Sequence, residues 1–181
     1  MSQPTSEALA VVAFWRDAGP SRWFTKDPGF DAAFRERFLA LHERAASGDL
    51  DGWAETADGA LALLILLDQL PRNAFRGSPR MYATDPQALR IAHAALARGL
   101  DDQVPPELRG FMVMPLMHSE DPADQALCVE KSAQLPHTLP HALEHQDIIR
   151  RFGRFPHRNA VLGRTSTAPE ERFIAEGGFS G

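Results

Sequence analysis

Cysteine is almost absent from this chain of 181 residues, because Cys128 is the only one. A single cysteine cannot form an internal disulfide or supply a thiolate zinc cluster, so the composition suits a reducing cytoplasm. Cys128 follows Ala126 and Leu127 in a helical pattern, and buried apolar cysteines are usually inert. We therefore expect Cys128 to have a structural role.

Long hydrophobic runs are also missing. The most apolar stretch, ALALLILL at residues 60–67, is enclosed by Asp58 and Asp68, and it is far shorter than the roughly twenty residues of a membrane span. The N-terminal segment has no basic region, and Arg16 and Asp17 interrupt its apolar run, so no signal peptide is expected. Residues 60–67 are predicted to form a buried helix in a soluble, cytoplasmic protein with no membrane partner.

An excess of positive charge is missing from the chain as a whole, which carries a net charge of -5. One segment departs from this balance: RRFGRFPHRNAVLGR, residues 150–164, has five arginines and no acid, so the remainder carries -10. That remainder would repel a long polyanion, although Phe152 and Phe155 could stack on bases. We therefore expect no nucleic-acid partner, and we expect any anion bound near residues 150–164 to be small.

Strand patterns are nearly absent, whereas helix signals recur. Thr5 or Ser6 can cap a first helix that ends at Gly19, and the stripe of Phe30, Phe34, Phe38 and Leu41 predicts the buried face of a second. The pair Asp-Pro occurs at residues 27–28, 85–86 and 121–122, each time before a helical pattern. Aspartate caps free backbone amides and proline suits the first helical position, so each pair predicts a helix start.

A second helix is expected after each of these three, at residues 54–70, 105–117 (bent at Pro115) and 140–152. A final short helix has the capping box of Thr167 and Glu170 and ends at Gly177. The fold class is therefore predicted to be all-α, with helical hairpins stacked as a right-handed solenoid like tetratricopeptide repeats. The length predicts one domain, residues 1–181.

The arginine-rich segment begins at the end of the helix predicted over residues 140–152. His141, His145, Ile148 and Phe152 are spaced to share one face of it, and Gly153 can terminate it in the left-handed conformation. Cations near a helix C-terminus offset its dipole. This role suits three of the arginines, which are Arg150, Arg151 and Arg154.

The other two arginines, Arg158 and Arg164, lie beyond that helix. PHRNA at residues 156–160 echoes PRNA at residues 71–74, so two hairpins end in the same way. Arginine and asparagine together suit recognition of a carboxylate, a phosphate or a peptide backbone. The alternative is a buried salt-bridge network, in which Asp68 and Glu120 are the candidate partners.

Three blocks carry a resemblance to a known family. LLDQLPRNAFRG, MPLMHSED and HQDIIRRFGRFPHRNAVLGRTSTAPEERF resemble the signature blocks of a bacterial family catalogued as domain of unknown function 924, and the resemblance begins at VVAFWRDAG. It implies an all-helical fold similar to tetratricopeptide repeats, and it implies no particular activity. The polar residues that fall in the family's motifs are Asp68, Gln69, Arg72, Asn73, His118, Ser119, Glu120, His145, Arg154, His157, Arg158, Asn159 and Arg164.

If the three blocks converge, they form a charged pocket between helices. We expect it to bind a small anionic molecule or the carboxylate of a peptide or metabolite, with no cofactor. The candidate ligand-binding residues are Asp68, Arg72, Asn73, His118, Glu120, His145, Arg154, His157, Arg158, Asn159 and Arg164. Arginine supplies charge, asparagine supplies orientation, and a histidine supplies a pH-sensitive contact.

Two alternatives remain open. The first is a hydrolase that is metal-assisted or based on a His/Glu pair, with His118, Glu120 and His145 as candidate catalytic residues. HALEH at residues 141–145 matches H-x-x-E-H, so His141 and His145 are candidate metal ligands, although this class of site needs a third ligand. For that ligand the candidates are Glu170, Glu171, His118 and His157.

The second alternative is that the polar blocks are purely structural.

Ser119 lies between His118 and Glu120, but neighbours in sequence seldom provide the geometry of a nucleophile and its base. Ser119 to Asp121 more simply caps the helix that begins at Pro122.

Overall fold

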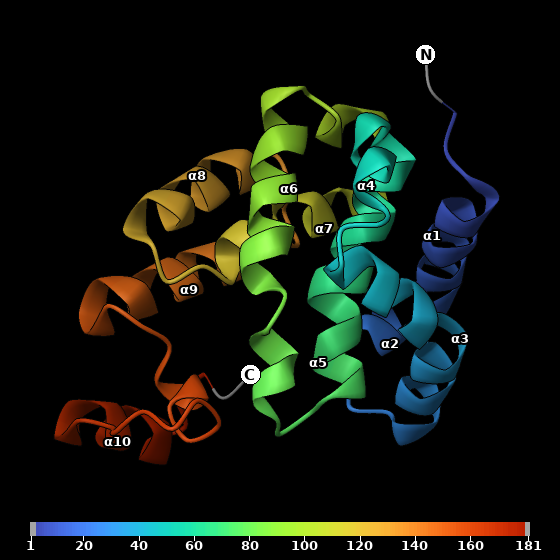
Figure 1. Cartoon of the computed structure of the whole chain (residues 1–181). Helices are drawn as coiled ribbons and strands as arrows, with labels where there is room; N and C mark the ends of the chain where they lie inside the picture. The colour runs from blue at the N-terminus through green and yellow to red at the C-terminus, as the bar shows by residue number, and fades with distance from the viewer. Residues whose placement is uncertain (1–2, 180–181) are drawn as a thin grey trace. The chain divides into compact units, whose positions relative to one another are not determined.

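The structure, a computed structural model, describes residues 3–179, and that range contains helices and loops but no strand. Figure 1 shows the α-helices, whose bounds are α1 (Ser6–Ala18), α2 (Pro20–Trp23), α3 (Pro28–Ala46), α4 (Ala57–Leu64), α5 (Leu70–Ala74), α6 (Asp85–Ala97), α7 (Arg109–Met117), α8 (Pro122–Ser132), α9 (Leu139–Phe152) and α10 (Ala168–Ala175). Shorter helical turns lie between them: η1 (Asp51–Glu55), η2 (Ile65–Gln69), η3 (Pro79–Tyr82), η4 (Asp101–Gln103), η5 (Pro106–Leu108) and η6 (Pro156–Arg158). The predicted all-α fold class is confirmed.

The chain divides into two compact units. The first comprises Met1–Arg76 and Arg80–Pro115, and the second comprises Gly77–Pro79 and Leu116–Gly181. The boundary in the second half of the chain therefore falls within α7, directly after the proline where a bend was expected. The expectation of a single domain stays a prediction.

The core of the first unit is the continuous helix formed by α4, η2 and α5. Every residue from 59 to 71 in it is buried, as expected for the apolar run ALALLILL. Helices α1 and α6 pack against α4, and α3 packs against η2 and α5. The helix begins at Ala57 and extends to Ala74, a few residues later at each end than predicted. No helix within residues 3–179 is long and apolar enough to span a membrane.

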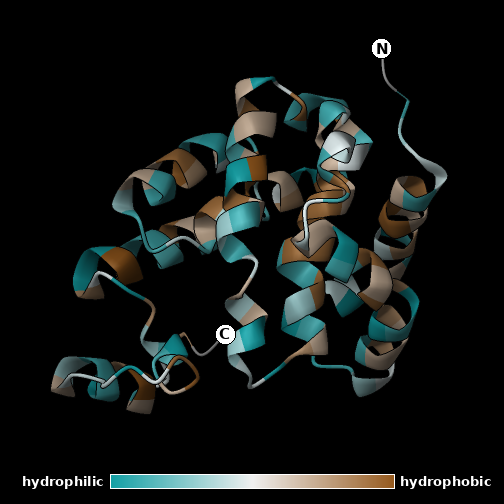
Figure 2. Ribbon diagram, in the orientation of Figure 1, coloured by the Kyte–Doolittle hydropathy of each residue, from teal (hydrophilic) through white to brown (hydrophobic). Residues whose placement is uncertain are grey.

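Aromatic rings fill the space between α1 and α3. Phe30, Phe34 and Phe38 of α3 are buried, as their spacing predicted, while Leu41 is only partly buried. Phe34 lies 5.4 Å from Phe14, measured between ring centroids. Most helices carry both hydrophilic and hydrophobic residues in Figure 2, which is the pattern of helices with one buried face.

The second unit is built on the hairpin of α8 and α9, which pack side by side (Figure 1). One hydrophobic cluster of this unit consists of Ile148, Ile149 and Phe155, with Phe152 and Phe173 packed against it. Cys128 of α8 is fully buried, and burial raises the pKa of its thiol to about 11. A thiol with that pKa stays protonated near neutrality, which agrees with the structural role expected for Cys128.

The predicted helix starts are confirmed at all three Asp-Pro pairs, because α3, α6 and α8 begin at Pro28, Asp85 and Pro122. Asp27 and Asp121 are N-caps whose carboxylates accept backbone N–H groups of α3 and α8. The capping box of Thr167 and Glu170 is also formed at the start of α10. The capping role is wrong at Asp85, because the N-cap of α6 is Thr84 and Asp85 is the first residue of the helix.

A substitution at Gly59 would test how closely the buried helix packs against its neighbours. A Cβ atom at this position would lie 2.1 Å from the backbone carbonyl O of Trp53, far inside van der Waals contact. Alanine normally stabilises a helix interior by about 1 kcal/mol relative to glycine. We predict the opposite sign here: Gly59→Ala lowers the free energy of unfolding by roughly 1 to 3 kcal/mol, measured by urea denaturation.

The matched control is Gly52→Ala, because a Cβ at Gly52 meets nothing within 4 Å. That variant is expected to leave the free energy of unfolding within about 0.5 kcal/mol of the wild type. Equal stabilities for the two variants would contradict the close approach at Gly59.

Candidate functional site

The first sequence motif lies where the buried helix widens by one residue. At η2 the backbone N–H of Leu70 donates to the carbonyl O of Ile65, five residues back. The next residue, Pro71, has no N–H to offer to the carbonyl of Leu66. That carbonyl instead accepts a hydrogen bond from Nδ1 of the buried His42 at 2.9 Å. A side chain from α3 thus satisfies a backbone group that the proline leaves open.

Arg72 follows this wide turn and joins two carboxylates. Its two terminal nitrogens each donate to one oxygen of Asp85 at 3.0 Å, and Nη1 lies 3.1 Å from Oδ1 of Asp68. Burial alone would lower the pKa of Arg72, but the attraction of Asp68 and Asp85 outweighs it and raises that pKa. The carboxylate of Asp85, which was predicted to cap α6, is engaged in this ion pair instead.

Asn73, the next polar residue of the first motif, is also held by an acid. Its amide Nδ2 donates to Oδ1 of Asp31 in α3 at 2.6 Å. Nε of Arg76 donates to the other oxygen of the same carboxylate at 2.7 Å. Asp31 was not predicted as part of any site, because it lies 42 residues before Asn73 and no local pattern connects the two.

The second motif forms the turn between α7 and α8. The amide of Gln125 donates to three backbone carbonyls of this turn, including that of Ser119 at 2.7 Å. The hydroxyl of Ser119 donates to Asp124 at 2.6 Å and accepts the N–H of Asp121. Ser119 therefore supports the start of α8, as expected, and its proton is directed at a carboxylate rather than at a histidine.

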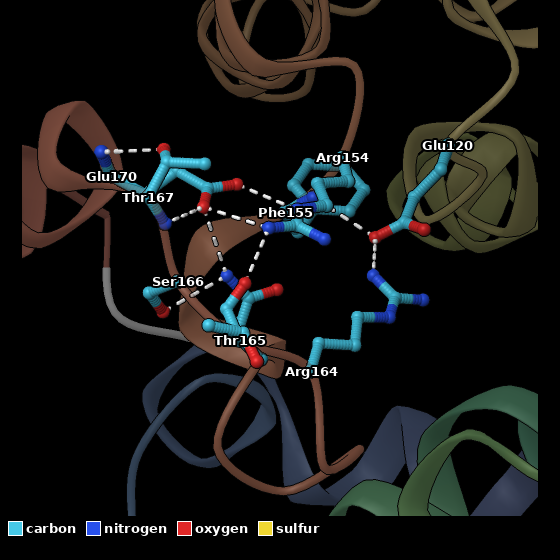
Figure 3. A network of polar contacts seen from close by, with 9 residues as sticks. Glu120, Arg154, Phe155, Arg164, Thr165, Ser166, Thr167 and Glu170 are labelled. Atoms are coloured by element: carbon cyan, nitrogen blue, oxygen red, sulfur yellow. Dashed lines mark hydrogen bonds and ion pairs between the residues drawn. The ribbon is translucent and has the colours of Figure 1, made fainter.

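Glu120, the last residue of the second motif, connects it to the third. Oε1 of Glu120 accepts the backbone N–H of Phe155 at 2.9 Å and Nη1 of Arg164 at 2.8 Å, as Figure 3 shows. Burial would raise the pKa of Glu120, but the hydrogen bonds from Arg164 and Phe155 lower it. The salt bridge expected between Glu120 and an arginine of residues 150–164 is confirmed.

Arg154 is bound by an acid that the sequence analysis assigned only to a helix cap or to a metal. Its Nε and Nη2 donate to the two oxygens of Glu170 at 2.6 and 2.8 Å, and Nη2 also donates to the carbonyl of Thr165 (Figure 3). The amide of Asn159 donates to Glu170 as well, at 3.3 Å. Arg154 therefore forms a bidentate ion pair with α10, and its expected role in offsetting the dipole of α9 stays a prediction.

Arg150 and Arg151 follow the simpler expectation for the end of α9. Both side chains are exposed and pair with Asp147, one turn earlier on the same helix. Pairs of this kind contribute little to stability, because water screens them and the long side chains lose freedom when they pair. Their positive charge is thus largely local to the surface of α9.

His145 is buried in the second unit among rings. Its ring centroid lies 5.4 Å from Phe155, 4.5 Å from Phe179 and 6.4 Å from His118. Burial, followed by the nearby His118, lowers the pKa of His145 to about 4. His145 is therefore neutral at pH 7, and its expected role as a pH-sensitive contact stays a prediction.

The predicted shared face of α9 is wrong at its first member. His141 is exposed and His145 is buried, because the buried face of α9 runs through Ala142, His145, Ile148 and Ile149. The two imidazoles of HALEH therefore do not point to a common place. Within residues 3–179, no group of three histidine, cysteine, aspartate or glutamate side chains has a geometry that could hold a metal ion, so the hydrolase alternative gains no support from a metal centre.

The second unit gathers most of the predicted polar residues. The residues of the second and third motifs form two sets of contacts. In one, Glu120 binds Phe155 and Arg164. In the other, Glu170 binds Arg154 and Asn159. The first motif has its own acids in the first unit, namely Asp31 and Asp85. Its convergence with the other two motifs stays a prediction.

Sequence comparison places these motifs in a family. Residues 11–178 match the sequence profile of a family described as bacterial protein of unknown function (DUF924). The chain belongs to this family. The resemblance noted from the three blocks is confirmed, and it extends over nearly the whole chain. No curated protein matches the chain.

A solved structure of similar sequence shares the family's fold. It is described as a protein of unknown function from Agrobacterium tumefaciens, with 48% sequence identity and a TM-score of 0.93. The match covers 95% of this chain and 98% of the other. The helical fold described above is therefore similar to one that has been solved for a relative.

Glu170 supports a prediction about acid stability. The ion pair with Arg154 lowers the pKa of Glu170 to about 2, from an ordinary value of 4.5. A depressed carboxyl pKa stabilises the fold above about pH 4.5, and this stabilisation disappears as the pH falls toward 2. We predict that Glu170→Gln is less stable than the wild type at pH 7 and that the difference shrinks between pH 4.5 and 2.

Urea denaturation at pH 7, 4 and 2.5 measures this difference. Glu171→Gln is the matched control, because Glu171 is the exposed neighbour on the same helix. A difference between Glu170→Gln and the wild type that stays constant across this range would show that the ion pair does not hold the carboxylate.

His145 predicts a second pH effect in a different range. Its pKa is about 4 in the folded chain, compared with an ordinary value of 6.5. Between these two pH values, His145 is protonated in the unfolded chain but not in the folded chain. The wild type should therefore lose about 3 kcal/mol of stability as the pH falls from 6.5 to 4. We predict that His145→Phe lacks this loss. NMR titration of His145 in the wild type should give a midpoint near 4, and a midpoint near 6.5 would refute the assignment.

Proposed function

We propose that this protein binds a small anionic molecule, or the carboxylate of a peptide or metabolite, in its second unit. The site is a set of side chains that we name the imidazole–guanidinium cluster: His118, Glu120, His145, His157, Arg158 and Arg164. One observation carries the proposal. Arg164 uses Nη1 to bind Glu120, while no group within residues 3–179 pairs with its Nε and Nη2 (Figure 3).

The position of Arg164 suits ligand binding. Its side chain is 31% exposed, so its two remaining donor groups can reach a molecule in solution. The bond to Glu120 restricts the guanidinium to one orientation, which reduces the entropy lost when a ligand binds. Arginine presents its donors in a planar fork that matches carboxylate and phosphate oxygens. Arg164 is thus oriented by the fold and still available to a ligand.

The local charge favours an anion. Arg158 and Arg164 both lower the pKa of Glu120, so two guanidinium groups lie near one carboxylate. The guanidinium of Arg158 also lies 4.5 Å from the centre of the Phe155 ring, and the ring of the neutral His145 lies 5.4 Å from the same ring. The cluster therefore carries a net positive charge within a chain whose net charge is -5. Partial burial strengthens the attraction of such a site for a small anion.

Part of the predicted ligand-binding set is better assigned to structure. Arg154 and Asn159 donate to Glu170, and in the first unit Arg72 and Asn73 donate to Asp85 and Asp31. These donors already have carboxylate partners. We assign to them the role of holding helices in position, which was the structural alternative for the polar blocks.

The finer points of the architecture remain proposals. We propose that the two units form one domain and that the hairpins stack as a right-handed solenoid like tetratricopeptide repeats. The solenoid is supported by the hairpin of α8 and α9, whose helices pack along each other, and by the similarity of the motifs to the family. We also propose a cytoplasmic location, which the single buried cysteine supports.

The test is an anion titration of the wild type and of variants at two arginines. The thermal midpoint of the wild type is measured against phosphate, small mono- and dicarboxylates and peptides with a free C-terminus. A ligand at a hundred times its Kd adds about 2.7 kcal/mol, which should raise the midpoint by roughly 5 to 10 °C. We predict that Arg164→Gln weakens binding of the anion by about 10- to 100-fold, because it removes charged hydrogen bonds.

Arg150→Gln is the matched control. It removes one positive charge from the same segment, but its side chain is 78% exposed and pairs only with Asp147. Binding should be unchanged in this variant and partly retained in Arg164→Lys. Equal losses in Arg150→Gln and Arg164→Gln would indicate general charge attraction and would refute a site at Arg164.

A further inference from the structure

The first unit contains a cavity that none of the three motifs lines. It has a volume of about 380 Å³ and is formed by the end of α1, by Arg22 of α2 and by the start of α3, which lie together in Figure 1. Pockets for small molecules usually have volumes of about 300 to 1,000 Å³. The cavity is therefore large enough for a small metabolite, and the function proposed for the second unit does not account for it.

One wall of the cavity is apolar. Phe14 and Phe30 line it, and their rings stack on each other with centroids 5.6 Å apart. Ala18 and Ala33 are the other apolar residues of the lining, and their small side chains leave the space between α1 and α3 open. An apolar group of a ligand can pack against this wall.

The exposed part of the lining carries charges of both signs. Asp17 and Arg22 both line the cavity and are exposed, but they form no ion pair with each other. The side chain of Arg22 has no hydrogen bond or ion pair within residues 3–179. Asp17 lies 3.8 Å from Arg16, whose side chain is also exposed, and such pairs contribute little. An acid and a base thus line one cavity without neutralising each other.

Asp17 lies where the charge of a helix disfavours an acid. It is the last residue but one of α1, and the C-terminal end of a helix carries partial negative charge. A cation beside Asp17 would offset both charges. Asp27, the other acid of the lining, is different because it caps α3 through the N–H groups of Gly29 and Phe30. The charges that remain for a ligand are therefore one acid and one base.

We propose that this cavity binds an α-amino acid with an apolar side chain. The carboxylate of the amino acid binds the guanidinium of Arg22, which presents a planar fork of donors. The ammonium group binds Asp17 at the negative end of α1, and the side chain packs against Phe14 and Phe30. A simple carboxylic acid or a simple amine would leave one of the two charged residues without a partner, whereas a zwitterion pairs with both.

Calorimetric titration of the whole chain with four compounds tests the proposal. L-phenylalanine and L-leucine are apolar amino acids, 3-phenylpropionate lacks the ammonium group of phenylalanine, and phenethylamine lacks its carboxylate. We expect both amino acids to bind. The two analogues should bind roughly 5- to 50-fold more weakly than phenylalanine, because each loses charge-assisted hydrogen bonds.

Two variants assign the contacts of the two charged groups. Arg22→Gln should weaken the binding of phenylalanine and leave that of phenethylamine unchanged, because phenethylamine has no carboxylate. Asp17→Asn should weaken the binding of phenylalanine and leave that of 3-phenylpropionate unchanged. Lys26→Gln is the matched control, because Lys26 is an exposed cation four residues after Arg22 that does not line the cavity. It should bind phenylalanine as the wild type does.

A third variant fills the cavity. Ala33→Leu places a larger side chain in the lining and should abolish the binding of both amino acids. Leucine is a good helix former, so α3 should keep its structure, and an unchanged thermal midpoint verifies this. Ala32→Leu is the matched control, because Ala32 is exposed on the same helix and does not line the cavity.

Arg164→Gln separates this site from the function proposed for the second unit. It should bind phenylalanine as the wild type does, and a loss in this variant would overturn the proposal. Equal affinity for phenylalanine and 3-phenylpropionate, equal effects of Arg22→Gln and Lys26→Gln, or failure of both amino acids to bind would overturn it as well. A chain that binds amino acids but none of the anions at Arg164 would refute the function proposed for the second unit and support this site.

Discussion

A helix that is apolar on every side must be surrounded, and this requirement organises the first unit. The helix of α4 and η2 is buried over its whole circumference, so α1, α3 and α6 pack around it. Its backbone must also be satisfied without water. Pro71 leaves the carbonyl of Leu66 open, and His42 closes it. The first motif begins at this wide turn. The backbone of the buried helix at Pro71 therefore affects both the packing of the core and the placement of Arg72.

Two arginines of the positive segment are explained by acids that lie far away in the sequence. Arg164 meets Glu120, 44 residues earlier, and Arg154 meets Glu170, 16 residues later. Each pair is partly shielded from water, which makes an unpaired partner costly and the pairing specific. After these pairs are formed, Nε and Nη2 of Arg164 have no partner within residues 3–179. The proposed site follows from what the network leaves unsatisfied.

Local signals in the sequence were reliable where the interaction itself is local. Asp27 and Asp121 cap helices as predicted, because an N-cap joins residues only two or three positions apart. At Asp85 the helix also begins as predicted, but the carboxylate does not cap it, because it pairs with Arg72, 13 residues before it. The period of α9 placed His141 with His145, but the hydrophobic face of the helix is rotated and leaves His141 in solvent. Spacing alone does not say which stripe of a helix is buried.

The sequence by itself determined the helical class, the buried run at residues 60–67 and the family, because periodicity, capping and motifs are properties of short segments. It also located the polar blocks in which the site is proposed. Only the tertiary structure decided which polar groups are paired: Glu170 binds Arg154, Asp31 binds Asn73, and Glu120 binds Arg164. Those outcomes depend on side chains brought together from distant segments and on the burial that fixes their charge, and neither is encoded in any one stretch of the chain.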